Sequence, residues 1–137
     1  MSKSVEAIEG IGPKYGAKLS KIGCSSPAKL LADGATRKGR KEIASTAGIS
    51  ESIVLRCVNM ADLFRIKGVA TQYAELLEAA GVDTVKELRN RNAKNLYQAM
   101  QKTNTGRKKR YVRQLPSEKM VAGWIDQAKK LKPIVTY

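Results

Sequence analysis

Residues 8–13 read Ile-Glu-Gly-Ile-Gly-Pro, and 58 positions later residues 66–70 repeat the same outline as Ile-Lys-Gly-Val-Ala. The residues that follow the two stretches match at the same offset. The matched pairs are Tyr15 with Tyr73, Leu19 with Leu77, and Gly23 with Gly81. The sequence therefore predicts an internal duplication in which each copy begins with a glycine turn and a helix.

Both stretches have the composition of a tight turn that opens a helix. Gly10 and Gly12 allow positive φ and let bare amides approach whatever lies opposite. Pro13 suits the first position of a helix, where free N–H groups and the positive end of the helix dipole favour an anion such as phosphate. This arrangement resembles the helix-hairpin-helix motif.

Members of the helix-hairpin-helix family mostly bind DNA without sequence preference, with hairpin amides on the phosphate backbone, often as two motifs about a pseudo-twofold axis. The resemblance spans most of the chain, which is also similar to small, uncharacterised proteins with two helix-hairpin-helix repeats. It implies an all-α fold in which duplicated helix-hairpin-helix units pack as one compact helical body. It also implies non-sequence-specific nucleic-acid binding through backbone phosphates.

The duplication extends to the end of the chain, with one insertion in the second copy. Residues 50–61 align with residues 117–128 at an offset of 67 instead of 58. The change of offset places extra residues at about 104–115. We therefore assign residues 1–62 to the first repeat and residues 63–137 to the second.

Glycine, proline and hydroxyl-bearing residues indicate where the helices begin and end. A long helix is expected to begin after Ser50 and to continue through Leu63 toward Ile66. Residues 36–41 and 89–94 are expected to form basic turns. The helices are expected at 13–22, 27–34, 42–47 and from 51 in the first repeat, and at 71–80, near 85–88, around 96–100 and from 117 in the second.

The chain is strongly basic, with 26 Lys and Arg residues against 12 Asp and Glu residues and a formal net charge of +14. Sixteen of the basic residues lie in residues 63–137, where six acidic residues oppose them. Such a charge favours association with a polyanion, and nucleic acid is the first expectation. A basic surface that only keeps the protein soluble is the alternative.

Several classes of protein are not indicated. No run of about 18 apolar residues and no signal peptide occurs, so a cytoplasmic protein is expected. Cys24 and Cys57 lack metal-type spacing and the chain has no histidine, so we expect no metal or other cofactor. Cys57 and its counterpart Trp124 fit a core. No catalytic constellation is present, so enzymatic activity is not expected. No helix offers the clustered Arg, Asn and Gln side chains of a major-groove reader, so sequence-specific reading is not expected either.

We predict four kinds of nucleic-acid-binding surface: the first hairpin, the second hairpin, the basic turns, and a basic loop in the insertion. In the loop, Tyr111 is available to stack on a base or sugar. The predicted contacts are Gly10, Ile11, Gly12, Lys14 and Lys18 at the first hairpin; Lys67, Gly68 and Thr71 at the second; Arg37, Lys38, Arg40, Lys41, Arg91 and Lys94 at the turns; and Arg107, Lys108, Lys109, Arg110 and Arg113 in the loop.

Each surface has a second interpretation. Glu9 opposes an anion at the first hairpin. Ala70, in place of the second glycine, either adopts an unfavourable positive φ or forces a different turn. In this second interpretation, the two hairpins only pack helices together, the basic turns are solvated helix ends, and the basic loop docks an acidic partner.

Taken together, these patterns indicate an accessory or architectural nucleic-acid-binding protein, with DNA favoured over RNA and no membrane partner. One alternative is a protein-interaction module whose basic loop docks an acidic protein. Another is a subunit of a larger nucleic-acid enzyme whose catalytic chain lies elsewhere.

Overall fold

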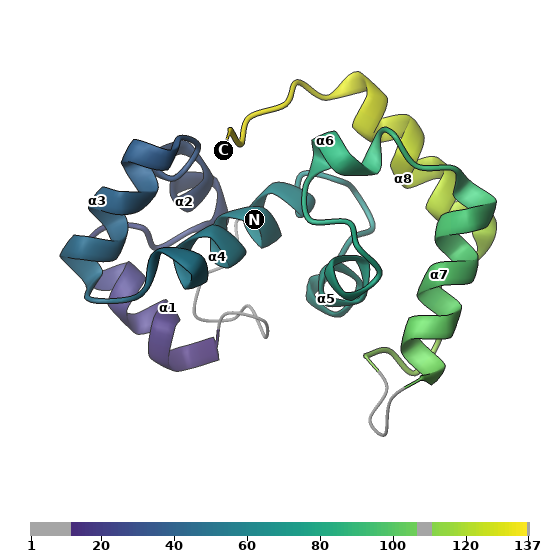
Figure 1. The fold of residues 1–137 in the computed structure, drawn as a ribbon, viewed down its shortest axis with the longest axis horizontal. Helices are drawn as coiled ribbons and strands as arrows, with labels where there is room; N and C mark the ends of the chain where they lie inside the picture. The colour runs from purple at the N-terminus through teal and green to yellow at the C-terminus, as the bar shows by residue number, and fades with distance from the viewer. Residues whose placement is uncertain (1–11, 107–110, 137) are drawn as a thin grey trace. The chain divides into compact units, whose positions relative to one another are not determined.

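The computed structural model describes residues 12–106 and 111–136, and within these ranges the chain forms eight α helices and no strand (Figure 1). The prediction of an all-α fold is confirmed. Among the described residues, no helix combines the length and apolar character needed to cross a membrane. The helices are α1 (Gly12–Lys21), α2 (Pro27–Asp33), α3 (Arg37–Ala47), α4 (Glu51–Leu63), α5 (Thr71–Ala79), α6 (Val85–Leu88), α7 (Ala93–Thr105) and α8 (Glu118–Lys130).

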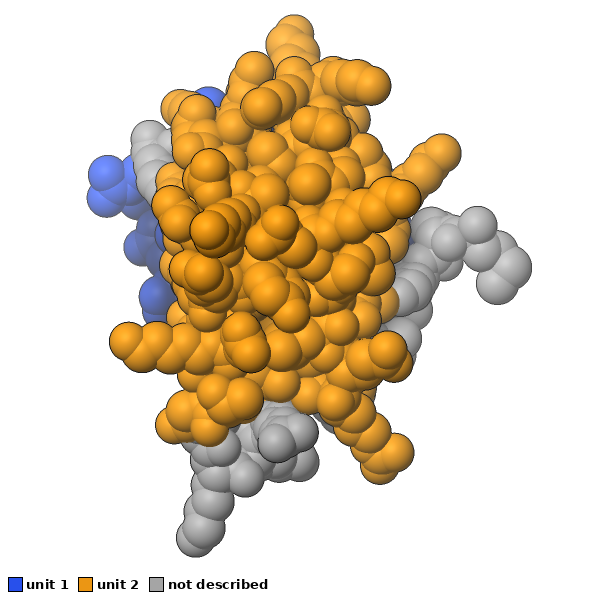
Figure 2. Space-filling model, turned by 90° about the vertical axis from the view of Figure 1, so that its right-hand side faces the viewer, with its two compact units in different colours: residues 1–62, 134–137 blue, residues 63–133 orange. Residues whose placement is uncertain are grey.

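The chain divides into two compact units, coloured separately in Figure 2. Unit 1 comprises residues 1–62 and 134–137, and unit 2 comprises residues 63–133. The division falls at the boundary expected between the two repeats. The C-terminal segment from Ile134, however, belongs with the first unit and not with the second repeat.

Three helices in each unit begin at a capping side chain. In every case the side-chain oxygen accepts a hydrogen bond of 3.1 or 3.2 Å from the N–H three residues later, which satisfies one of the free donors of the first turn. The caps occupy matching places in the two copies. They are Ser26, Thr36 and Ser50 in unit 1, and Thr84, Asn92 and Ser117 in unit 2.

The turns that follow α1 and α5 also have the same geometry. Gly23 and Gly81 have φ values of 92° and 100°, in the left-handed region that glycine adopts without a Cβ penalty. The N–H after each glycine donates to the carbonyl five residues earlier, at 2.9 Å in unit 1 and 2.8 Å in unit 2. The two copies therefore share local structure as well as sequence.

The segment predicted as a basic turn in the first repeat is the first turn of α3. This helix begins at Arg37, not at about Glu42, because Thr36 caps it. Gly39 does not interrupt the helix. A Cβ on Gly39 would lie 2.1 Å from the Asp33 carbonyl oxygen, so the close approach between the end of α2 and α3 requires glycine there.

The connection between the two copies is a pair of turns. α4 ends at Leu63 and does not continue toward Ile66 as expected, because the N–H of Ile66 turns back to the Leu63 carbonyl at 3.1 Å. The N–H of Val69 then donates to the Ile66 carbonyl at 3.2 Å, with Gly68 at φ 94°. Ala70 is extended, at φ −86° and ψ 174°. Of the two outcomes expected for Ala70, an unfavourable positive φ or a different turn, the second hairpin therefore has the different turn.

Each unit has its own apolar core, formed by one face of each helix. In unit 1, α1 and α2 pack against α3; in unit 2, α8 packs against α6 and α7, and α5 packs against α7. Cys57 and Trp124 are 2% and 3% exposed, which confirms their predicted core positions. The fully buried side chains include Leu19, Leu30, Val54, Val58 and Met60 in unit 1, and Leu76, Leu77, Leu88, Leu96, Met100 and Val121 in unit 2.

Candidate nucleic-acid interface

The outer side of α1 carries a row of three lysines. Lys14 and Lys21 are exposed and Lys18 is half-buried, and their spacings of four and three residues place them on one side of the helix. On the opposite side Gly16 and Leu19 are buried. α1 contains no acidic residue, and none of the three lysines is paired with a carboxylate among the described residues.

This lysine row is electrostatically unfavourable in the free protein. Two like charges at i and i+4 destabilise a helix by about 0.2–0.5 kcal/mol, and a polyanion alongside the row would convert this repulsion into attraction. The row extends about 10 Å along the helix axis. Lys14 and Lys18 were predicted from the sequence, but Lys21 was not, although its i, i+4, i+7 spacing would have identified it.

Three cations project from the first turn of α3. Arg37, Lys38 and Lys41 are exposed, and the turn contains no acidic residue. The positive end of the helix dipole lies at this terminus and disfavours the cations. An anion would be stabilised there by the dipole and by the side chains together. Three of the four basic residues predicted in this segment therefore remain candidates.

Arg40 is not one of them, and its assignment to the interface is corrected. Its side chain is buried, with 4% exposed. Nη1 donates to the carbonyls of Gly34 and Ala35 at 2.9 and 3.1 Å, and Nη2 donates to the Thr136 carbonyl at 2.6 Å. Arg40 shares the inward face of α3 with Ile43, so its guanidinium holds the end of α2 and the C-terminal segment together within unit 1.

The second hairpin is bonded to α8. The Lys67 N–H donates to Gln127 Oε1 at 2.9 Å, and Gln127 Nε2 donates to the Lys67 carbonyl at 3.2 Å. The Val69 N–H is used within the turn. A Cβ on Gly68 would lie 3.1 Å from Trp124 Nε1. Two hairpin amides thus have partners inside unit 2, which favours the packing interpretation for this hairpin.

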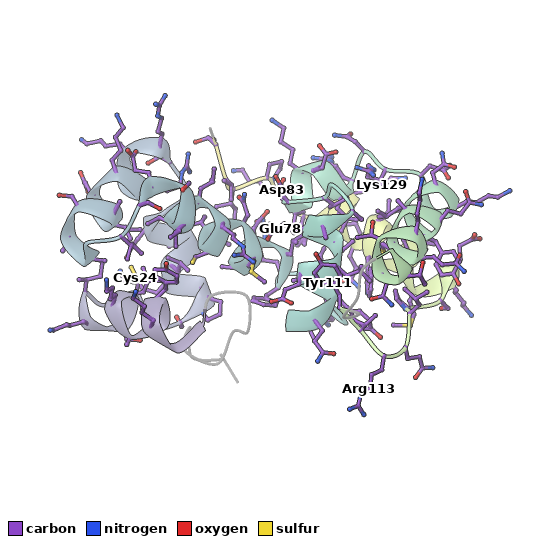
Figure 3. All side chains as sticks on the ribbon, turned by 60° about the horizontal axis from the view of Figure 1, so that its bottom comes forward. Cys24, Glu78, Asp83, Tyr111, Arg113 and Lys129 are labelled. Carbon is purple, nitrogen blue, oxygen red and sulfur yellow. The ribbon has the colours of Figure 1, made fainter. Side chains whose placement is uncertain are left out.

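The helix that follows this hairpin is acidic where α1 is basic. α5 contains Glu75 and Glu78 and no basic residue; Glu78 is labelled in Figure 3. Among the predicted contacts, Thr71 begins α5 and Lys67 has an exposed side chain. Unlike α1, the helix that follows the second hairpin therefore offers no cation to a phosphate.

Disrupting the second hairpin is expected to change stability but not nucleic-acid binding. Gln127→Ala should lower the free energy of unfolding by about 1 kcal/mol, because two hydrogen bonds are lost. Gly68→Ala should lower it by about 1–2 kcal/mol, because alanine is strained at this φ. Urea unfolding followed by circular dichroism measures both, with the exposed Gln72→Ala as the control. Weaker nucleic-acid binding by Gln127→Ala at unchanged stability would contradict the packing role.

Arg91 is held against the turn that follows α5. Its Nη1 donates to the Gly81 carbonyl and to Glu87 Oε1, each at 3.4 Å, and Nη2 donates to the Ala80 carbonyl at 3.5 Å. The side chain is half-buried, so Arg91 is not the free cation that the prediction required. Lys94, in the first turn of α7, is exposed and stays a candidate.

The insertion in the second copy is attached to α7 at its base. Asn104 Nδ2 donates to the Val112 carbonyl and the Val112 N–H donates to Asn104 Oδ1, both at 3.1 Å and both buried. Arg113 follows this attachment, is exposed, and points away from the helices (Figure 3). At the first hairpin, Gly12, Lys14 and Lys18 lie within α1. The remaining predicted contacts of the first hairpin and of the loop lie outside the described residues: Gly10, Ile11, Arg107, Lys108, Lys109 and Arg110.

The two cysteines have structural positions. Burial, together with a 3.5 Å hydrogen bond to Asp33 Oδ2 and the charge of that carboxylate, raises the pKa of the Cys24 thiol to about 11. The thiol therefore stays protonated and unreactive near neutral pH. Cys24 and Cys57 are both buried and free. Within the described ranges no group of three His, Cys, Asp or Glu side chains is placed to hold a metal ion.

These features define a small, basic, all-helical protein with an internal duplication and outward-facing rows of cations. Over residues 9–131 the chain matches the model of a family described as a domain of unknown function (DUF4332), and it belongs to that family. No curated protein and no solved structure matches the chain.

Proposed function

We propose that this protein binds nucleic acid, with duplex DNA as its preferred form, through the phosphates of the backbone. The observation that carries the proposal is the lysine row of α1, Lys14, Lys18 and Lys21, which projects from a helix without any carboxylate. Its three like charges repel one another in the free protein. A polyanion is the ligand class that turns this arrangement into a stabilising one.

The first turn of α3 extends the same chemistry within unit 1. Arg37, Lys38 and Lys41 stand at a helix N-terminus, where backbone dipoles and side chains act together on an anion. The likeness of residues 8–13 to a helix-hairpin-helix turn supports a further phosphate contact immediately before α1, and it rests on sequence alone. A cytoplasmic accessory or architectural role fits these contacts.

Backbone contacts position a protein on nucleic acid without selecting a sequence. Fluorescence anisotropy of a labelled duplex of random sequence, titrated at two salt concentrations and repeated with single-stranded DNA and with RNA, tests the proposal. We expect binding that weakens steeply as salt rises, because each neutralised phosphate releases counterions, with the duplex DNA bound most tightly. No binding to any of the three at low salt would exclude this function.

The second hairpin favours a competing function for unit 2, a protein-interaction module with an acidic partner. The Lys67 amide is occupied by Gln127 and the Val69 amide by the turn itself, as in a packing joint. Arg113 and the basic stretch before it would then contact an acidic protein. Weak salt dependence of nucleic-acid binding, or no binding to nucleic acid at all, would favour this alternative.

A further inference from the structure

α7 divides cleanly into a buried and an exposed side. Leu96, Met100 and Asn104 are 0%, 0% and 2% exposed and face α5 and α8. The side chains of the other face are all exposed, and the helical period of 3.6 residues gathers them into one stripe. We call this stripe the α7 outer face, and it consists of Lys94, Asn95, Gln98, Gln101, Lys102 and Thr105.

The α7 outer face is basic and rich in side-chain amides. It has two lysines and three amides, and α7 contains no Asp or Glu from Ala93 to Thr105. Neither Lys94 nor Lys102 is paired with a carboxylate among the described residues. The face is therefore positive, and it can both donate and accept hydrogen bonds along its length. The expectation that no helix clusters Asn and Gln overlooked this face, because Asn95, Gln98 and Gln101 are three positions apart and not adjacent.

From this face we infer that α7 enters the major groove of B-form DNA and that its amides hydrogen-bond to base edges; the inference rests on the proposed nucleic-acid binding. A helix of 13 residues is about 20 Å long, and the major groove of B-DNA is wide enough to admit one. Gln98 and Gln101 lie in the middle of the face, where a bidentate amide pairs with adenine N6 and N7. Lys94 and Lys102 flank them and face the phosphates at the groove edges.

Because of these contacts to bases, unit 2 gives the protein a preference for particular base pairs, which the phosphate contacts of the lysine row in unit 1 do not give. The contacts of α7 also distinguish DNA duplexes from RNA duplexes. The major groove of A-form RNA is deep and narrow and does not admit side chains for reading. Contacts through the α7 outer face are therefore specific to DNA duplexes, whereas phosphate contacts through α1 serve both.

The test is selection of duplexes with a randomised centre by the full-length protein, followed by sequencing of the bound fraction. The wild type should enrich duplexes with preferred base pairs by roughly tenfold. Gln98→Ala/Gln101→Ala should bind with the same salt dependence, because no charge is removed, but with the preference lost. Gln72→Ala, which removes an exposed amide from α5, should keep it. Alanine at these exposed helical positions preserves folding, and circular dichroism verifies this.

A second arm compares DNA with RNA. Lys94→Ala/Lys102→Ala should weaken binding to a DNA duplex severalfold more than binding to an RNA duplex of matched sequence. Duplex binding without base preference in the wild type, or a preference that persists in Gln98→Ala/Gln101→Ala, would overturn the inference and leave the proposed function standing. Absence of binding to any duplex would overturn both.

Discussion

Arg40→Leu is expected to lower the free energy of unfolding by about 3 kcal/mol, whereas Arg37→Ala, three residues earlier on the same helix, should leave it within about 0.5 kcal/mol. The Arg40 guanidinium donates to three backbone carbonyls inside unit 1. Leucine fills the space but supplies no donor, so the carbonyls of Gly34 and Thr136 lose the hydrogen bonds that Arg40 makes. Within the described residues, the C-terminal segment then keeps the two hydrogen bonds that Thr136 donates to the Ala35 carbonyl.

Substitutions of Arg37 and Arg40 are also expected to differ in their effect on nucleic-acid binding. Arg37 is exposed at the positive end of the α3 dipole, so its removal should weaken binding and slightly relieve the free helix. Arg40→Lys is a further control, because a single ammonium cannot reproduce the forked contacts of a guanidinium and should be intermediate in stability. Urea unfolding by circular dichroism measures the stabilities. If Arg40→Leu were as stable as the wild type and bound nucleic acid less well, Arg40 would have to be a surface cation.

Arg37 and Arg40 show which structural features depend on neighbouring residues in the sequence and which depend on residues far away in it. Three helix starts followed from local chemistry, because Ser26, Ser50 and Ser117 each satisfy an N–H three residues away. The start of α3 was expected at about Glu42 and lies at Arg37. The role of Arg40 depends on a carbonyl at Thr136, 96 positions distant. In a string of basic residues nothing local distinguishes it from Arg37.

The second hairpin illustrates the same limit. For Ala70 the sequence left two outcomes open, a costly positive φ or a different turn, and the structure has the second, with Ala70 extended. The hydrogen bond from the Lys67 N–H of this hairpin to Gln127, 60 positions away, could not be predicted before the packing of α8 was known. Helix phase, in contrast, is available from sequence. Counting by 3.6 would have added Lys21 to the α1 row and would have revealed the α7 outer face.

Lys14→Ala/Lys18→Ala/Lys21→Ala is expected to weaken binding to duplex DNA by at least tenfold near 0.1 M salt and to flatten its salt dependence. Each phosphate contact contributes about 0.9 to the slope of log K against log salt, so loss of three contacts should reduce the slope by about 2.7. Stability should change little, because the lysines are exposed or half-buried, repel one another and are replaced by a strong helix former. Anisotropy titrations over a salt series give both the affinity and the slope.

A control with the same loss of charge separates a located interface from a general attraction. Lys86→Ala/Lys129→Ala/Lys130→Ala also removes three exposed lysines, from α6 and α8. Both triple variants lower the net charge equally, so long-range attraction falls equally in both. Only direct neutralisation of phosphates by α1 makes the first variant lose more affinity and more slope than the second. Equal losses in the two variants would mean that binding follows net charge alone and that the lysine row of α1 is not the interface.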